Sequence, residues 1–401
     1  MPRVLRIINR FNLGGPTFNV AYLSRYMEPE FETLLVGGQK DETEDSSEFI
    51  LENLGLNPFI IEEMKREIDL KNDIIAYNKI KKLIKEFKPH IVHTHASKAG
   101  TLGRLAAINQ KVPVIVHTFH GHVFHSYFGK TKTIFYKTIE QRLAKKTDLI
   151  IAVSEKQKEE LAFEHKIAPV EKIKVIGLGF DLSRFQFNSE NNRQEFRNKY
   201  QLEPDTIAIG IIGRLVPIKN HKMFLDVAKS VIQTIPEKKI QFFIVGDGES
   251  KDELLEYTKS LNLSCQYLDT KPDVRVTFTS WIKEVEKVLA GIDIVALTSN
   301  NEGTPVSLIE AQAANKPIVS TRVGGIENIV LEGKTALLSA VGDVNSMVLN
   351  IKKIISDEKL LKSESPEGWN YVKEKFHYTR LVKDMTETYY RLMEKKGIRM
   401  N

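Results

Sequence analysis

The chain has 401 residues, of which 42% are apolar and 27% charged, and its formal net charge is +6. This length exceeds what one hydrophobic core usually serves, so we expect two domains of an ordinary globular protein. The positive charge is too diffuse to predict nucleic-acid binding, and it would suit an anionic ligand or an anionic membrane surface.

The sequence favours the cytoplasm. A single cysteine, Cys265, excludes a disulfide framework and fits a reducing compartment. No stretch approaches the roughly 18 apolar residues of a membrane-spanning helix. The opening residues, MPRVLRIINRFNLGG, predict a strand and a turn, without the apolar core and cleavage site of a signal peptide.

Apolar runs alternate with helical patterns along the whole chain, which indicates βαβ units and parallel sheets. The first unit of this kind is a strand at 3–8, a turn containing Gly14 and Gly15, and a helix from Thr17. Glycines at the carboxyl end of a strand allow a ligand to approach the backbone closely. The turn lacks the G-x-G-x-x-G pattern, so a dehydrogenase is disfavoured.

Seven of the ten histidines lie between residues 90 and 125. The pair His93 and His95, and the pair His120 and His122, suggest zinc, but no cysteine or carboxylate set stands at a matching spacing, so we expect no metal. His93 falls within a predicted buried strand. His120 ends the next strand, where open α/β sheets bind ligands. His122 is the competing candidate, and a packing histidine is the alternative.

A long helix is expected at 126–148, with aromatic, aliphatic and lysine positions interleaved. Such a helix would lie on an anionic bilayer. A lysine-rich helix with a buried stripe explains the pattern equally well.

The second half of the chain begins with a strand at 207–215 that carries Arg214, and Lys219 follows at a helix start. A guanidinium fork and a mobile ammonium are the groups that a diphosphate requires. The alternative is two ordinary surface cations. The strand at 240–246 ends in Gly246, which we expect either to line a ligand pocket or to make a tight turn.

The stretch SNNEGTPVSLIEAQAANKPIV (299–319) follows a buried strand and opens a helix. We expect Thr304 as its N-cap and Pro305 as its first residue. Glu302 then lies in the loop and Glu310 in the helix, and the free N–H groups behind Gly303 favour phosphate. Two carboxylates flanking an anion site suit a nucleotide-sugar, whereas a loop carboxylate and a solvated helix residue are the plain alternative.

No Asp-x-Asp pair occurs in the sequence. A metal-dependent transferase typically offers its divalent cation such a pair of oxygen ligands. Side-chain cations would therefore neutralise a diphosphate here, and we expect neither a metal nor another cofactor.

The segment EGTPVSLIE (302–310) followed by AQAANKPIVSTRVGGIENIV resembles the signature of retaining glycosyltransferases of family 4. The resemblance implies the α/β GT-B fold, two facing Rossmann-like domains with a cleft between them. We expect an acceptor-side domain at 1–185, a donor-binding domain at 200–375, and a terminal helix at 376–401 that returns to the first domain. The motif departs from many members, which carry an aromatic residue and a glycine where Thr304 and Pro305 stand.

The resemblance also assigns roles. It places Glu310 on the ribose, Glu302 near the donor sugar, and His120 near the reacting carbon. It places Arg214 and Lys219 on the diphosphate, because GRLVPIKN matches a family element. Gly14 and Gly15 face the donor phosphates and the acceptor; Gly246, Gly303, Thr304 and Pro305 complete the predicted donor site.

The predicted activity is transfer of a hexosyl or N-acetylhexosaminyl group, with retention, from a nucleotide-sugar, expected to be UDP-linked. The acceptor would be a glycan or a lipid-linked sugar in cell-surface polysaccharide synthesis, and no nucleic acid takes part. We expect a cytoplasmic enzyme, peripheral on the inner face of the membrane. The alternatives are a sugar-nucleotide epimerase or phosphorylase of the same fold, or a non-catalytic nucleotide- or glycan-binding protein.

Overall fold

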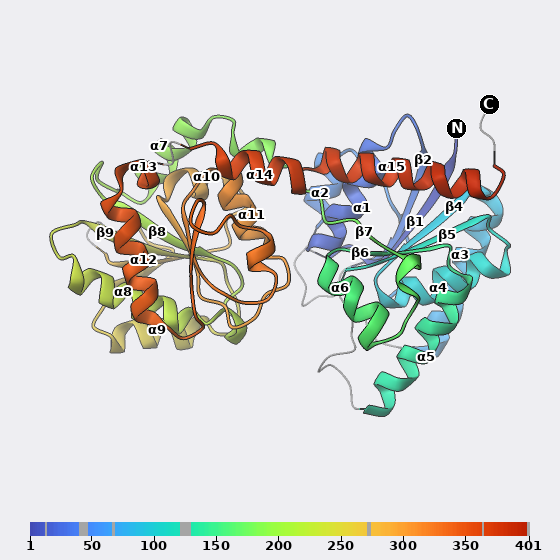
Figure 1. Cartoon of the computed structure of the whole chain (residues 1–401), viewed down its shortest axis with the longest axis horizontal. Coiled ribbons are helices and arrows are strands. Elements are labelled where there is room, and N and C mark those ends of the chain that lie inside the picture. The colour runs from blue at the N-terminus through green and yellow to red at the C-terminus, as the bar shows by residue number, and fades with distance from the viewer. Residues whose placement is uncertain are drawn as a thin grey trace. The chain divides into compact units, whose positions relative to one another are not determined.

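The computed structural model describes residues 1–12, 14–39, 47–65, 69–120, 130–270, 274–362 and 365–398. The chain forms two compact units (Figure 1). One comprises Met1–Phe180 with Phe376–Asn401, and the other comprises Asp181–Lys375. The division falls five residues before the domain end that the sequence suggested at 185, because Ser183–Phe185 packs on the second unit.

The first unit is a parallel sheet covered by helices. Its strands are β1 (Arg3–Arg10), β2 (Glu32–Gly38), β3 (Phe59–Ile60), β4 (Ile91–His95), β5 (Val114–Phe119), β6 (Leu149–Ala152) and β7 (Ile173–Val175). Its α-helices are α1 (Gly15–Tyr26), α2 (Glu48–Asn53), α3 (Leu70–Phe87), α4 (Ser97–Asn109), α5 (Lys130–Lys146), α6 (Glu155–Glu159) and α15 (Tyr378–Lys395). The strand order is β3-β2-β1-β4-β5-β6-β7.

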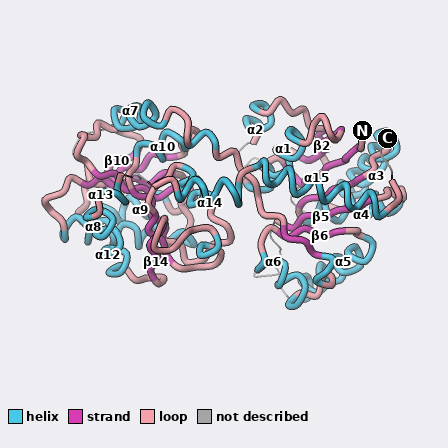
Figure 2. The backbone as a smooth tube through the Cα atoms, turned by 45° about the horizontal axis from the view of Figure 1, so that its top comes forward, coloured by secondary structure: helices cyan, strands magenta, loops and turns pink. Residues whose placement is uncertain are grey.

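The second unit repeats this architecture in one continuous segment. Its strands are β8 (Ile207–Ile212), β9 (Ile240–Val245), β10 (Cys265–Tyr267), β11 (Val276–Ser280), β12 (Ile294–Leu297), β13 (Ile318–Thr321) and β14 (Ala336–Ser339). Its α-helices are α7 (Ser189–Lys199), α8 (His221–Thr234), α9 (Lys251–Ser260), α10 (Val285–Gly291), α11 (Val306–Ala313), α12 (Val344–Ser356), α13 (Glu358–Leu361) and α14 (Glu367–Phe376). Figure 2 shows the strands at the centre of each unit, with the helices around them.

Both sheets contain a point at which the strand order reverses, between β1 and β4 in the first unit and between β8 and β12 in the second. All pairs of neighbouring strands among the described residues of the two sheets are parallel, as the continuous apolar runs predicted. In sheets of this kind, ligands bind outside the carboxyl ends of the strands at the reversal. The loops after β1 and β4, and those after β8 and β12, are therefore the places to look for a site.

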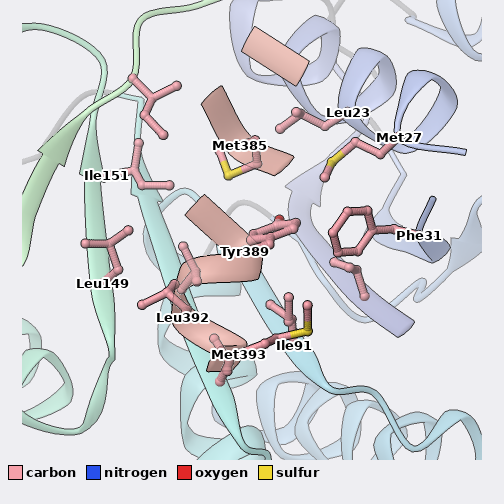
Figure 3. Close-up of a cluster of buried hydrophobic side chains, with 14 of the residues drawn as sticks. Leu23, Met27, Phe31, Ile91, Leu149, Ile151, Met385, Tyr389, Leu392 and Met393 are labelled. Carbon is pink, nitrogen blue, oxygen red and sulfur yellow. The ribbon is translucent and has the colours of Figure 1, made fainter. Parts of the chain in front are cut away.

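The last helix, α15, belongs to the core of the first unit. His377 caps its N-terminus by accepting a hydrogen bond from Thr379 N, so α15 begins at Tyr378, two residues after the expected start at 376. Met385, Tyr389 and Leu392 lie in a buried cluster with residues of α1 and the central strands (Figure 3). The terminal helix is thus a structural part of the sheet's cover.

A buried polar chain runs through this cluster. The guanidinium of Arg6 donates to the Tyr389 hydroxyl at 3.1 Å, and that oxygen lies 2.6 Å from His93 Nδ1. His93 Nε2 lies 2.7 Å from Thr118 Oγ1, so both ring nitrogens of His93 have buried hydroxyl partners.

Candidate active site

The loops at the strand reversal of the second unit are held together by hydrogen bonds. Asn300 N donates to Ile218 O at 2.8 Å, and Thr298 Oγ1 donates to Asn220 O at 2.9 Å. Asn220 Nδ2 donates to Asn300 Oδ1 at 3.2 Å. These bonds fix the loop that follows β8 against the loop that follows β12, and so they fix the side chains that both loops carry.

The structure brings two of the predicted site residues, Lys219 and Glu302, into direct contact. Lys219 Nζ lies 2.5 Å from Glu302 Oε1, and the Ser299 hydroxyl donates to the same oxygen at 2.6 Å. The side chains of Lys219 and Glu302 are 21% and 10% exposed. Such a shielded pair interacts more strongly than an ion pair in open water. Sequence reasoning missed Ser299, whose only signal was a hydroxyl at the end of a buried strand.

Close backbone packing supports the Glu302 loop from beneath. Gly324 has a φ of 55°, and a Cβ there would overlap the carbonyl oxygen of Glu302. Gly325 N donates to that same oxygen at 3.2 Å. The Gly-Gly turn after β13 therefore fixes the position of the Glu302 backbone, and only glycine fits at Gly324.

This packing yields a testable prediction. Gly324→Ala should displace the Glu302 loop, with a loss of about 1–3 kcal/mol in the free energy of unfolding. Gly333→Ala is the matched control, because its φ of 80° carries similar strain while open space surrounds its Cβ position, so it should lose less stability. Denaturant unfolding of both variants measures the difference. Equal losses in the two variants would contradict the supporting role of Gly324.

Helix α11 begins one residue later than expected. Pro305, with an extended ψ of 110°, occupies the N-cap position, and no side chain caps the helix. The prediction that Thr304 caps and Pro305 opens the helix is therefore wrong, because Pro305 keeps an extended conformation. The free N–H groups of the first turn still follow Gly303, so the anion-favouring character of the helix start is kept.

Glu310 lies in α11 and is paired with a residue that the sequence analysis did not select. Arg184 Nη2 lies 3.1 Å from Glu310 Oε1, and the Glu310 side chain is 14% exposed. Burial raises the pKa of Glu310 above its usual value, and the charge and hydrogen bond of Arg184 oppose that rise. The only signal for Arg184 was its place in GLGFDLSRF, the segment that leaves the first domain.

Two further candidates of the second unit, Arg214 and Gly246, lie in the loops that follow β8 and β9. Arg214 follows the end of β8 and is exposed. Gly246 has a φ of 145°, and a Cβ there would overlap the carbonyl oxygen of Gly213, so the loops after β8 and β9 touch through backbone. Burial raises the pKa of Asp247, but the hydrogen bonds from the Ser280 hydroxyl, Gly248 N and Tyr267 and the charge of Lys251 together hold that pKa below its usual range. The Gly246 turn is thus a constrained backbone junction.

The first unit carries its candidates at the carboxyl edge of its sheet. Gly14 precedes α1, which Gly15 opens, and both follow β1. His120 follows β5, and its Nε2 lies 3.0 Å from Nδ1 of His95 at the end of β4. Burial lowers the pKa of His120 to about 4, so the imidazole is neutral near pH 7. A neutral imidazole offers a hydrogen bond without a charge.

The other histidines of this region are committed to internal contacts. His93 is held between Tyr389 and Thr118, and His117 Nδ1 lies 2.8 Å from Thr94 Oγ1. Within the residues that the structure describes, no group of three or more histidine, cysteine, aspartate or glutamate side chains is arranged to hold a metal ion. His122 lies outside the described residues.

Comparison with known proteins covers both halves of the chain. The model of Glycosyltransferase Family 4 matches residues 14–184, and the model of Glycosyl transferases group 1 matches residues 206–357. The UDP-Gal:alpha-D-GlcNAc-diphosphoundecaprenol alpha-1,3-galactosyltransferase of Escherichia coli is 31% identical over 335 residues, 82% of this chain and 83% of that protein. The capsular polysaccharide biosynthesis glycosyltransferase CapM of Staphylococcus aureus is 25% identical over 328 residues, 81% of this chain and 83% of CapM.

Solved structures share the fold. Anabaena HepE in complex with UDP superposes with a TM-score of 0.78 at 19% identity, over 97% of this chain and all 100% of that one. Sucrose-phosphate synthase from Thermosynechococcus elongatus gives 0.75 at 17% identity, over 98% and 100% of the two chains. These likenesses confirm the predicted GT-B architecture.

No helix among the described residues is long and apolar enough to cross a bilayer. Three findings lead to one assignment. They are the reversal of strand order in both parallel sheets, the family matches to both halves of the chain, and the 31% identity to the Escherichia coli galactosyltransferase over four-fifths of the chain. The protein is a glycosyltransferase of family 4 with the GT-B fold.

Proposed function

We propose that this enzyme transfers a hexosyl or N-acetylhexosaminyl group, with retention, from a UDP-sugar to a lipid-linked or glycan acceptor. Two named likenesses support this choice: the Escherichia coli relative uses UDP-galactose and a diphosphoundecaprenol acceptor by its name, and the HepE structure contains UDP. We further propose that the enzyme works at the inner face of the membrane, where lysines of α5 would meet anionic lipid.

The observation that carries the proposal is the constellation at the strand reversal of the second unit. A shielded cation, Lys219, and an exposed one, Arg214, stand at loops that also carry the start of α11. These groups would bind the diphosphate, with Glu302 near the donor sugar and Glu310 on the ribose. A donor bound in this way would have its diphosphate at the cations and its two sugars at the carboxylates, which matches the polarity of a nucleotide-sugar.

The proposed reaction breaks the bond between the anomeric carbon and the phosphate oxygen, and its electron pair stays on the diphosphate. Arg214 and Lys219 would stabilise the charge that develops there. The acceptor hydroxyl attacks from the same face and forms the new glycosidic bond, and its proton passes to the leaving phosphate.

The test is thermal unfolding with UDP, GDP and ADP. We expect UDP alone to stabilise the wild type, by about 2.7 kcal/mol at a concentration about 100-fold above Kd, and Glu310→Ala to abolish the effect. Stabilisation by no diphosphate at millimolar concentration would contradict the donor site.

The alternatives separate by product. An epimerase would isomerise the sugar of UDP-hexose without an acceptor, and a phosphorylase would cleave a glycan only with inorganic phosphate. A binding protein would retain UDP affinity and release no UDP from the donor when acceptor is added. The transferase releases UDP in proportion to acceptor consumed.

A further inference from the structure

Arg184 lies on the short 3-10 turn Ser183–Phe185, directly after the division between the two units, and contacts two carboxylates of the second unit. Its Nη2 lies 3.1 Å from Glu310 Oε1, and its Nη1 lies 3.6 Å from Glu286 Oε2 on α10. Arg184 thus bridges two carboxylates. The side chains of Arg184 and Glu286 are 38% and 22% exposed, so this bridge lies partly in contact with solvent.

Several contacts hold Arg184 in this position. The neighbouring Phe185 is buried, at 5% exposure, and its ring centroid lies 4.8 Å from the Arg184 guanidinium carbon. On the other side, Gln186 Nε2 donates to Ala313 O at 2.5 Å. Ala313 and Glu310 share α11, so the segment that carries Arg184 is fastened to the helix that carries the carboxylate. The guanidinium is therefore presented to Glu310 by a fixed backbone.

The proposed role of Glu310 requires its carboxyl group to be ionised. To accept hydrogen bonds from two vicinal hydroxyls, its carboxyl must be ionised, since the protonated form donates one proton itself. Burial opposes ionisation, and the charge of Glu286 opposes it further. Arg184 is the cation that favours the ionised form. It engages Oε1, and a carboxylate with about four lone-pair sites retains capacity for a ligand.

We propose that Arg184 is a positioning residue for donor binding: it holds the Glu310 carboxylate ionised and oriented toward the ribose of the nucleotide. This inference rests on the proposed function and adds a residue to it. The charged groups that face Glu310 are Arg184 on the 3-10 turn and Glu286 on α10. These two act in opposite directions on the ionisation of Glu310.

The opposite effects of Arg184 and Glu286 on the ionisation of Glu310 can be tested by experiment. UDP affinity is measured by calorimetry between pH 5.5 and 8 for the wild type, Arg184→Met, Arg184→Lys and Glu286→Gln, as the ratio of variant to wild-type Kd at each pH. This ratio cancels the titration of the diphosphate itself. Arg184→Met should weaken binding about 10- to 100-fold at low pH and less at high pH, because the carboxylate protonates more readily. Arg184→Lys should recover part of the loss.

Glu286→Gln should have the reverse effect, and UDP binding should persist to lower pH than in the wild type. Arg193→Met is the matched control, since Arg193 of α7 also pairs with a carboxylate, Asp293, at 2.8 Å and is 31% exposed. It should cost stability without changing the pH dependence of UDP binding. If Arg184→Met does not fold, Arg184→Lys and Glu286→Gln still test the two opposite effects on UDP binding at low pH.

Each outcome separates the inference from the proposed function. If Glu310→Ala abolishes UDP binding while Arg184→Met weakens it equally at every pH, Arg184 is only a structural strap and the inference fails alone. If Glu310→Ala leaves UDP binding unchanged, Glu310 is not in the donor site, and both the inference and that part of the proposed function fall.

Discussion

Lys219→Met is expected to lower kcat for sugar transfer by about 10²- to 10³-fold, the usual loss when one preorganised donor to a developing anion is removed. The Lys219 ammonium is shielded and lies 2.5 Å from Glu302 Oε1, so its position is set before a donor arrives. In the proposed donor site, replacement removes a positive charge from beside the diphosphate and leaves Glu302 with the Ser299 hydroxyl alone. Steady-state kinetics with a UDP-sugar and an acceptor measure the change.

The control for this prediction lies three residues along the chain. Lys222 of α8 also makes a 2.5 Å ion pair, with Glu253, but the two side chains are 47% and 61% exposed. Exposed pairs contribute little, so Lys222→Met should leave kcat near the wild-type value. If Lys219→Met kept the wild-type kcat, Lys219 would not stabilise the transition state, and Arg214 would be the cation that stabilises the leaving group.

The first unit is expected to lose stability steeply as the pH falls from about 6.5 to 5. His93, His95 and His117 are fully buried, and burial holds the pKa of each well below the ordinary value of 6.5 and lowers the pKa of the neighbouring His120 to about 4. Above pH 6.5 these histidines are neutral in both the folded and the unfolded state and contribute nothing to the pH dependence. Below pH 6.5 they bind protons in the unfolded chain but not in the folded unit, so the free energy of unfolding falls by up to about 5 kcal/mol per pH unit for the four groups.

The second unit provides an internal control, because His221 is its only histidine. Burial lowers the pKa of His221 to about 4, so the second unit should show about one quarter of the slope of the first. Both tryptophans, Trp281 and Trp369, lie in the second unit, so tryptophan fluorescence follows that unit while hydrogen exchange of β4 and β5 follows the first. His117→Asn should reduce the slope of the first unit by one proton. A flat stability between pH 7.5 and 5.5 would refute the prediction.

Much of the fold was readable because buried parallel strands are continuous apolar runs. The run at 292–299 became β12, and 240–246 became β9 with its glycine turn. The edge strands β3 and β10 had no such signal, since they have two and three residues and contribute few side chains to a core.

The site was predictable in its loops and unpredictable in its pairings. The motif placed Glu302 before a helix and Glu310 within it, as the structure has them. The contact of Glu310 with Arg184 joins residues 126 positions apart, and that of Lys219 with Glu302 joins residues 83 apart. Such contacts depend on where the sheet order reverses, and no local pattern encodes that. The catalytic and binding roles of these residues stay predictions.

The place of α15 in the first core has a consequence for the order in which the chain matures. Residues 181–375 form their unit from one uninterrupted stretch, whereas the unit made from the first 180 residues needs Tyr389 to pair Arg6 and His93. During synthesis the first unit therefore cannot complete its core until α15 has been made, and until then Arg6 and His93 lack their hydrogen bonds to Tyr389. A message truncated before codon 378 would yield a complete second unit joined to an unfinished first one.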